Sequence, residues 1–216
     1  MHLDNYTWEK SRKRRTIALM IGSQGELIVK SPVFTSKKVI ESFIKTKASW
    51  ILSQQERQKN RIHPELPIFK KEGFLYALGV RMPFVCIDEG PSKVIEEDEK
   101  IVIYAKNERL FNKSLTQWYR KKTADMVDLY LNKYLSMLTV QPLSVGYKRY
   151  RRKWGSCDHK NNLMFNILLS AHPCRHIEYV VVHELCHIKE KHHKASFWRH
   201  GEELLPEFRK IHKDML

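Results

Sequence analysis

The segment His183-Glu184-Leu185-Cys186-His187 constrains this chain more than any other, because it fits the pattern His-Glu-x-x-His. Residues i and i+4 lie on one face of a helix, so both imidazoles can reach a single metal ion. Glu184 sits beside the first histidine, where it can take a proton from a metal-bound water. The segment therefore predicts a helix that holds a zinc ion and the base that such an ion needs to activate water.

The surroundings of the motif are those of a buried helix. Pro173 can open the helix, and Ile177, Glu184 and Ile188 continue its period through the motif. Residues 179–182 form an apolar run directly before the motif. We expect this run to seat the helix in the core and to hold the ligands rigidly.

A third ligand is expected a few residues after the helix. Five residues separate His187 from His193, which is enough for the helix to end and the chain to turn back. His192 competes with His193, and spacing alone does not separate the two neighbours. Three protein ligands leave a fourth zinc position for water or substrate, as in a catalytic site. Cys186 faces away from the two histidines of the motif, so we expect it to pack in the core, with metal ligation as the alternative.

The charge of the chain makes nucleic acid a candidate partner. The 216 residues include 39 Lys and Arg against 24 Asp and Glu, for a formal net charge of +15. A field of this sign attracts polyanions. The basic residues are spread over most of the chain, however, so a generally basic, solvated surface explains the charge equally well.

We expect a cytoplasmic protein without a membrane partner. No apolar run approaches the roughly 20 residues that span a bilayer. The N-terminus is polar and has no apolar signal-peptide core. Four scattered cysteines without Cys-x-x-Cys spacing argue against a disulfide framework and a structural zinc ribbon.

Apolar periodicity indicates strands and helices that are segregated along the chain, which favours an α+β fold. The expected elements are a β-hairpin over 16–29, a helix over 36–58, short strands within 74–104, a helix over 115–134, a short strand after Pro142, a strand over 163–169 and two C-terminal helices divided near 193–196.

Several motifs beyond the histidine helix occur in a defined order. They are Arg152-Lys153-Trp154-Gly155-Ser156-Cys157, the Leu-Met-Phe-Asn of 163–166, the helix segment 177–187, the His-Lys-Ala-Ser-Phe-Trp of 193–198, and Pro206 in the terminal helix. In this order they resemble the YgjP-like metallopeptidase family, a relative of the SprT-like and Wss1-like (WLM) zinc peptidases. Weaker similarity in residues 14–17, 48–51 and 76–79 extends the resemblance over nearly the whole chain.

The resemblance implies a set of site residues. It implies that zinc is bound by His183, His187 and His193, and that Glu184 is the catalytic general base. It favours His193 over His192, because the family's histidine precedes a small spacer and Phe-Trp. The implied activity is that of a zinc-dependent metallopeptidase.

The resemblance also implies an architecture. We expect a zincin-like α+β metallopeptidase domain over residues 108–216, with the active-site helix beside a mixed sheet. A β-rich N-terminal part with one long helix is expected over residues 1–107. The two parts can pack as one unit.

The implied substrate is a peptide or protein. In zinc peptidases of this type, a strand beside the zinc helix binds an extended peptide by backbone pairing. The strand over 163–169 is the candidate here. Gly155 would allow a close approach, and Asn166 would hydrogen-bond the substrate or a ligand histidine. Core packing is the favoured role for Trp154.

Other classes of function stay open. Basic residues within 148–153, interleaved with Tyr147, Tyr150 and Trp154, can follow a phosphate backbone. The SprT-like and Wss1-like relatives act on DNA-bound proteins, so a nucleic-acid-associated metalloprotease is one alternative. Family members also carry the label UTP pyrophosphatase, although no Gly-rich phosphate loop is visible. The last alternative is a non-catalytic, zinc-stabilised protein, and the intact Glu184 argues against it.

Overall fold

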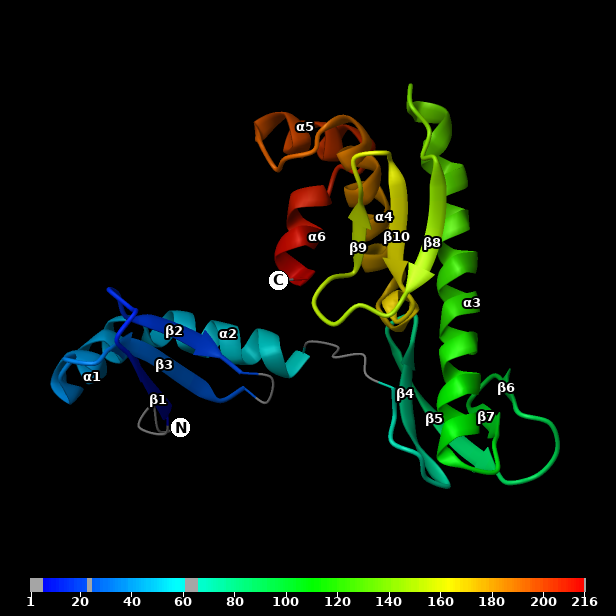
Figure 1. Ribbon diagram of the computed structural model, residues 1–216, viewed down its shortest axis with the longest axis horizontal. Coiled ribbons are helices and arrows are strands. Elements are labelled where there is room, and N and C mark those ends of the chain that lie inside the picture. The colour runs from blue at the N-terminus through cyan, green and yellow to red at the C-terminus, as the bar shows by residue number, and fades with distance from the viewer. Residues whose placement is uncertain (1–5, 23–24, 61–65, 216) are drawn as a thin grey trace. The chain divides into compact units, whose positions relative to one another are not determined.

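The chain folds into two compact units of mixed helices and strands, which confirms the α+β class (Figure 1). The computed structural model describes residues 6–22, 25–60 and 66–215. The units are Met1–Arg61 and Ile62–Leu216. The boundary expected at residue 107 falls inside the second unit, because strand β7 (Ile101–Tyr104) and helix α3 (Glu108–Tyr134) share one hydrophobic core.

The first unit contains a three-stranded sheet. Strands β1 (Tyr6–Ser11), β2 (Ala18–Ile21) and β3 (Leu27–Pro32) lie in the order β1-β3-β2. β2 is antiparallel to β3, which confirms the predicted hairpin. The parallel pairing of β1 with β3 was not predicted.

The helix expected over 36–58 is two helices, α1 (Lys37–Thr46) and α2 (Ala48–Asn60). The Thr46 hydroxyl donates to the Ser42 carbonyl at 3.0 Å, which is the type of side chain to backbone bond that bends helices. Apolar side chains on both sides of the break at Lys47 still face the same core. The residues buried together in this unit come from both helices and β3; they are Ile40, Ile44, Ile51, Leu27 and Val29.

The second unit begins with a four-stranded sheet in the order β4-β5-β7-β6. Its strands are β4 (Glu72–Ala77), β5 (Val80–Ile87), β6 (Lys93–Glu96) and β7. β5 and β7 are parallel, and the other pairs are antiparallel. Helix α3 covers this sheet through its N-terminal half, so the β-rich segment predicted over 74–104 belongs to the same core as the long helix.

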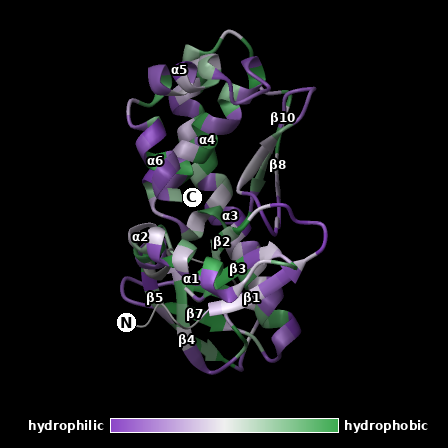
Figure 2. Ribbon diagram, turned by 90° about the vertical axis from the view of Figure 1, so that its left-hand side faces the viewer, coloured by the Kyte–Doolittle hydropathy of each residue, from purple (hydrophilic) through white to green (hydrophobic). Residues whose placement is uncertain are grey.

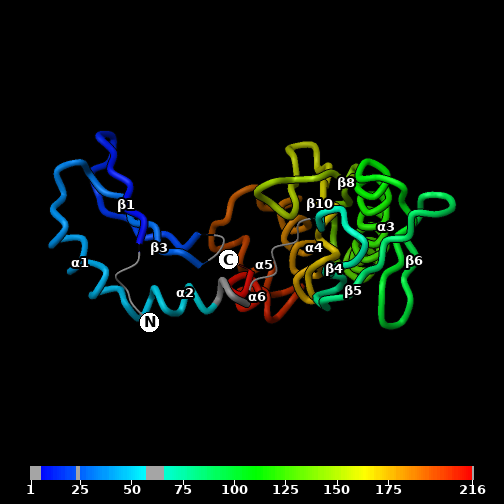
Figure 3. Tube along the Cα trace, turned by 90° about the horizontal axis from the view of Figure 1, so that it is seen from below, coloured from blue at the N-terminus to red at the C-terminus, as the bar shows by residue number. Residues whose placement is uncertain are grey.

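A second sheet lies beside the histidine helix. Strands β8 (Ser144–Lys148), β10 (Asn162–Asn166) and β9 (Gly155–Cys157) lie in that order, with β8 parallel and β9 antiparallel to β10. Helix α4 (Cys174–Lys189) packs against β9 and against α3 (Figures 1 and 3). The expected position of the histidine helix beside a mixed sheet is therefore confirmed.

Buried hydrogen bonds hold the segment that leads into α4. The hydroxyl of Thr123 on α3 accepts the Ser170 N–H at 3.1 Å. Ser170 in turn accepts the Leu78 N–H on its carbonyl at 2.7 Å. Gly79 follows with a φ of +87°, and a Cβ atom there would lie 2.7 Å from Pro173 Cγ. The turn between β4 and β5 is thus locked onto the start of α4.

Two element boundaries differ from the sequence-based expectations. The strand expected over 163–169 ends at Asn166, whose side-chain Oδ1 accepts the Leu168 N–H at 3.2 Å and turns the chain. Pro206 lies between α5 (Ala195–Leu204) and α6 (Phe208–Met215), not within a terminal helix. Proline lacks the N–H that a helix interior requires, so it separates the two helices.

Helix α4 is the centre of the largest buried cluster. Hydrophobic residues run along it in Figure 2. Its fully buried side chains include Ile177, Val181, Val182, Leu185 and Cys186. This burial gives the histidines a rigid support, and it agrees with the core position expected of Cys186. Within the described residues, no helix is both long and apolar enough to cross a membrane.

Candidate metal centre

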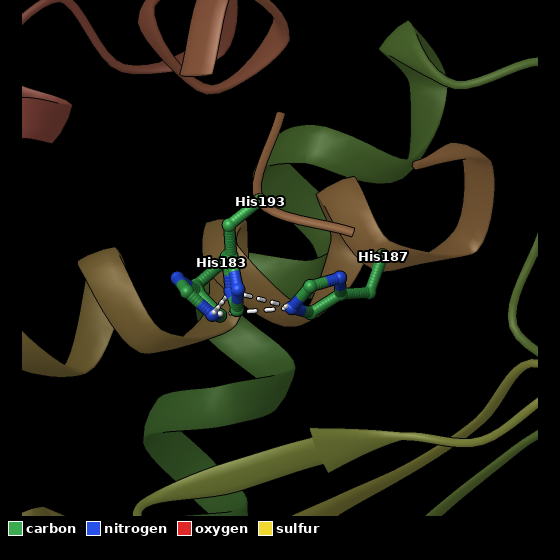
Figure 4. Close-up of side chains that lie close together, drawn as sticks. All are labelled: His183, His187 and His193. Atoms are coloured by element: carbon green, nitrogen blue, oxygen red, sulfur yellow. Dashed lines mark hydrogen bonds between the residues drawn. The ribbon is translucent and has the colours of Figure 1, made fainter. Parts of the chain in front are cut away.

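Three imidazole rings meet beside the C-terminal half of α4 (Figure 4). His183 and His187 lie one turn apart on the helix, and His193 comes from the segment that follows it. The Nε2 atoms are 3.2 Å apart between His183 and His187 and 3.1 Å apart between His187 and His193. The Nε2 atoms of His183 and His193 are 3.0 Å apart. The structure thus brings the three predicted ligands together.

The chain turns back toward α4 directly after the helix ends. Glu190 has an extended backbone, with φ −118° and ψ 90°, and its N–H donates to the Cys186 carbonyl at 2.9 Å. The His187 ring donates from Nδ1 to the Glu190 carbonyl at 2.9 Å, which holds the ring and the turn together. His193 belongs to the resulting cluster of rings, and its neighbour His192 does not.

The geometry of the cluster fits a metal ion. A tetrahedral zinc ion with Zn–N bonds of about 2.0–2.1 Å separates its nitrogen ligands by roughly 3.3 Å. The observed Nε2 separations of 3.0–3.2 Å are close to this value. Imidazole binds metals in its neutral form. Burial, and then the charges of His187 and His193, lower the pKa of His183 to about 3, and burial is also the main cause that lowers the pKa of His187.

Phe197 on α5 forms an apolar wall on which all three rings pack. Its ring centroid lies 5.0 Å from that of His183, 4.7 Å from His187 and 4.6 Å from His193. The side chain is fully buried, so it limits the movement of the imidazoles. The sequence placed Phe197 in a family motif but gave it no role, because its contact with α4 depends on the turn through Glu190.

Glu184 is a buried carboxyl group next to the cluster. Only 5% of the residue is exposed. Burial raises the pKa of Glu184 to about 8, and the charge of Lys153 opposes that shift. Strand β9 passes directly against this side chain, because a Cβ atom on Gly155 would lie 2.6 Å from Glu184 Oε1. The close approach expected of Gly155 is therefore made to Glu184, and its contact with a substrate stays a prediction.

Asn166 is used inside the protein. Its side-chain Nδ2 donates to the carbonyls of Tyr150 and Lys153, both at 3.1 Å. Its backbone N–H donates to the Trp154 carbonyl at 2.8 Å. The residue is 3% exposed, and its side-chain amide pins the loop between β8 and β9 through these hydrogen bonds. The predicted contact of Asn166 with a substrate or a ligand histidine stays a prediction.

The sheet order corrects the strand proposed for peptide binding. β10 is the central strand, and β8 and β9 occupy its two edges. A peptide can therefore not pair with it. β9 is an edge strand of this sheet and packs against α4, with Gly155 beside Glu184.

The loop before β9 carries the basic and aromatic residues that the sequence singled out. A cavity of about 660 Å³ is lined by Tyr150, Arg151, Arg152 and Lys153. Trp154 is half-buried, packs against both cores of the second unit, and meets the His172 ring edge-on with centroids 4.3 Å apart. The packing role favoured for Trp154 agrees with these contacts.

Comparison with known proteins finds a family match and similar solved structures. The family model described as "YgjP-like, metallopeptidase domain" matches residues 15–216. The metallopeptidase zymogen abylysin of Pyrococcus abyssi is similar at 21% sequence identity, with 42% of this chain and 89% of that chain covered and a TM-score of 0.35. No curated protein matches the chain significantly.

Proposed function

Because this chain belongs to the YgjP-like family of metallopeptidase domains, we propose that it is a zinc-dependent peptidase with His183, His187 and His193 as the metal ligands. Membership of this family supports a peptidase activity and implies a metal ion. The observation that carries the metal site is the triangle of Nε2 atoms, with sides of 3.0–3.2 Å. Imidazole nitrogen is a ligand that suits zinc.

The three imidazoles would hold a zinc ion with one coordination position left for water, and a bound zinc ion would lower the pKa of that water to about 7 and polarise a carbonyl oxygen. The chain supplies the proton transfers. Glu184 accepts a proton from the attacking water and delivers it to the leaving amine. Its pKa of about 8 makes it unusually basic for a carboxylate, and positive charge nearby, such as that of Lys153, favours the ionised form.

The substrate in this proposal is an extended peptide that pairs with the edge of β9. Backbone pairing with a sheet edge gives affinity that does not depend on sequence. Because Gly155 of β9 lies against Glu184, a peptide on this edge would pass close to the general base.

Metal removal and a single substitution test the proposal. Chelation should abolish hydrolysis of a peptide library, and added Zn²⁺ should restore it. Glu184→Gln should bind zinc with wild-type stoichiometry and lose about 10²–10⁴-fold in rate. Glu207→Gln is the matched control, because Glu207 is exposed and pairs with Lys210. Undiminished activity in Glu184→Gln would refute the proposed base.

A second candidate function, action on nucleic-acid-associated proteins, is favoured by the cavity at Tyr150, Arg151, Arg152 and Lys153. Within the described residues, Arg151, Arg152 and Lys153 form no ion pair, and Lys153 Nζ lies 4.9 Å from the centroid of the Tyr150 ring. Free cations beside an aromatic ring suit a phosphate backbone. Binding of a labelled oligonucleotide should fall steeply between about 50 and 200 mM salt. No retention at low salt would remove this candidate.

Nucleotide hydrolysis should be measured alongside hydrolysis of the peptide library. If the protein hydrolyses UTP and no peptide, and Glu184→Gln abolishes that reaction, the function is the alternative nucleotide pyrophosphatase. Peptide hydrolysis alone supports the peptidase.

A further inference from the structure

The hydroxyl of Tyr179 connects two histidines from different helices. Tyr179 lies one turn before His183 on α4, and its Oη is 2.9 Å from His183 Nδ1. The same oxygen is 2.7 Å from Nδ1 of His212 on α6. A continuous hydrogen-bonded chain therefore runs from a proposed metal ligand to the C-terminal helix.

The ring of Tyr179 holds this hydroxyl in place. The residue is 5% exposed, and its ring packs against Phe208 with centroids 4.8 Å apart. On the other side, the Trp198 ring meets His212 edge-on with centroids 4.8 Å apart. The three linked groups are thus fixed by packing from α5 and α6.

The direction of the two hydrogen bonds is coupled. A hydroxyl has one proton, so Tyr179 donates to one of the two nitrogens and accepts from the other. If Tyr179 donates to His183, the proton of that imidazole lies on Nε2, which then cannot bind a metal. If Tyr179 donates to His212, it accepts from His183 Nδ1–H, and His183 Nε2 is free to bind.

The proposed ligand His187 has a simpler partner. Its Nδ1–H donates to the Glu190 carbonyl, and a carbonyl can only accept, so the ligating tautomer is enforced. A tyrosine hydroxyl can donate or accept a hydrogen bond, so by itself it does not enforce one tautomer of the histidine. It acts like the carbonyl only when its own proton is taken by another acceptor, which for Tyr179 is His212 Nδ1.

We propose that Tyr179 is a positioning residue for the metal ligand His183, and that His212 gives the hydrogen-bonded chain its direction. The proposal rests on the proposed function, because it requires His183 to bind the metal through Nε2. Tyr179 orients the ring and selects its tautomer, and α6 contributes to metal affinity without contacting the metal.

The zinc affinity of Tyr179→Phe tests the proposal. The change keeps the buried ring and removes only the hydroxyl. We expect zinc affinity, measured by competition with a chromogenic chelator, to fall about 10–100-fold, as for other partners of metal ligands. Tyr134→Phe is the matched control, because Tyr134 lies in the same core cluster and its hydroxyl donates to Glu178 at 2.7 Å, away from the histidines. A Tyr179→Phe affinity within twofold of wild type, or an equal loss in Tyr134→Phe, would overturn the proposal.

Two variants of His212 test the direction of the chain. His212→Asn keeps an acceptor near the Nδ1 position, and His212→Leu removes it. We expect the leucine variant to lose zinc affinity severalfold and the asparagine variant to stay near wild type. Equal losses in both would show that packing, not hydrogen bonding, is responsible. His212 is only half-buried, so this pair carries the test if Tyr179→Phe does not fold.

The outcome separates the inference from the function on which it rests. Wild-type protein that binds no zinc overturns the proposed metal centre itself. Wild-type protein that binds zinc, with unchanged affinity in Tyr179→Phe and His212→Leu, overturns only the role of Tyr179 and His212.

Discussion

Gly155 and Glu184 are in direct contact, and the contact is possible only because position 155 lacks a side chain. A Cβ atom there would lie 2.6 Å from Glu184 Oε1, 2.7 Å from Cγ and 2.9 Å from Cδ. Distances below about 3.0 Å require one partner to move. Glu184 is buried in α4, so the spacing between β9 and this helix is matched to a glycine.

Gly155→Ala should therefore displace the carboxylate of Glu184. We expect kcat/KM for peptide hydrolysis to fall about 10²-fold, the cost of moving a catalytic group by about 1 Å. Zinc content should not change, because the three histidines keep their contacts with Phe197. Steady-state kinetics together with metal analysis check both parts.

Gly146→Ala is the control for this substitution. Gly146 lies on β8 of the same sheet, and its added Cβ would meet the flexible end of Met164, with Cε at 2.8 Å. A side-chain end of this kind can move at small cost, so activity should stay near wild type. If Gly155→Ala were as active as Gly146→Ala, the contact with Glu184 would have no catalytic importance.

The choice between two adjacent histidines can be tested by metal binding. His193→Ala removes one corner of the Nε2 triangle, so zinc affinity should fall by more than the roughly 10–100-fold cost of losing an outer partner. His192→Ala should bind zinc like the wild type, because His192 is not part of the cluster. Isothermal titration of both variants measures the difference, and a larger loss in His192→Ala would reverse the assignment.

The elements that could be predicted from the sequence are those with a local pattern. The i, i+4 spacing of His183 and His187 and the apolar period around them are properties of one helix, and α4 has both. The hairpin of β2 and β3 is local in the same way. Parallel pairings, such as β8 with β10, join segments separated by long loops, and no local period encodes them.

The same distinction between local and long-range contacts decides which site residues could be predicted. The cluster of three histidines depends on one short turn, so a motif was enough to anticipate it. The uses of Gly155 and Asn166 depend on how β9 and its preceding loop lie on α4, which the sequence does not state. Tyr179 was visible only as part of an apolar run, and the one available signal was its spacing of one helical turn from His183.

A buried hydroxyl between α3 and α4 gives a stability prediction. Glu178 on α4 accepts from the Tyr134 hydroxyl at 2.7 Å and from Lys133 Nζ at 2.6 Å. Glu178→Ala leaves the hydroxyl without an acceptor, which should lower the free energy of unfolding by about 1–3 kcal/mol.

The Lys133 partner of the same carboxylate serves as the control. Its side chain is 55% exposed, so Lys133→Ala should cost at most about 1 kcal/mol. Urea denaturation followed by circular dichroism measures both variants. Equal losses would mean that the exposed ion pair, and not the hydroxyl, is the important contact.

The loop that Asn166 pins gives the last prediction. Asn166→Leu removes the two side-chain bonds to the Tyr150 and Lys153 carbonyls and the bond to the Leu168 N–H. Stability should fall by about 1–3 kcal/mol, since the loop carbonyls lose their partner. The loop contains trypsin sites after Arg151 and Arg152, so limited tryptic digestion there should become faster as the loop opens locally.

A nearby asparagine provides the comparison for this digestion. Asn162 begins β10, and its side chain bonds Ser144 and Asp158, away from the loop. Asn162→Ala should leave the rate of cleavage after Arg151 and Arg152 close to that of the wild type. Mass spectrometry of the early fragments identifies the cut sites. A wild-type cleavage rate in Asn166→Leu would show that the loop is held by other contacts, with Trp154 and its packing as the remaining anchor.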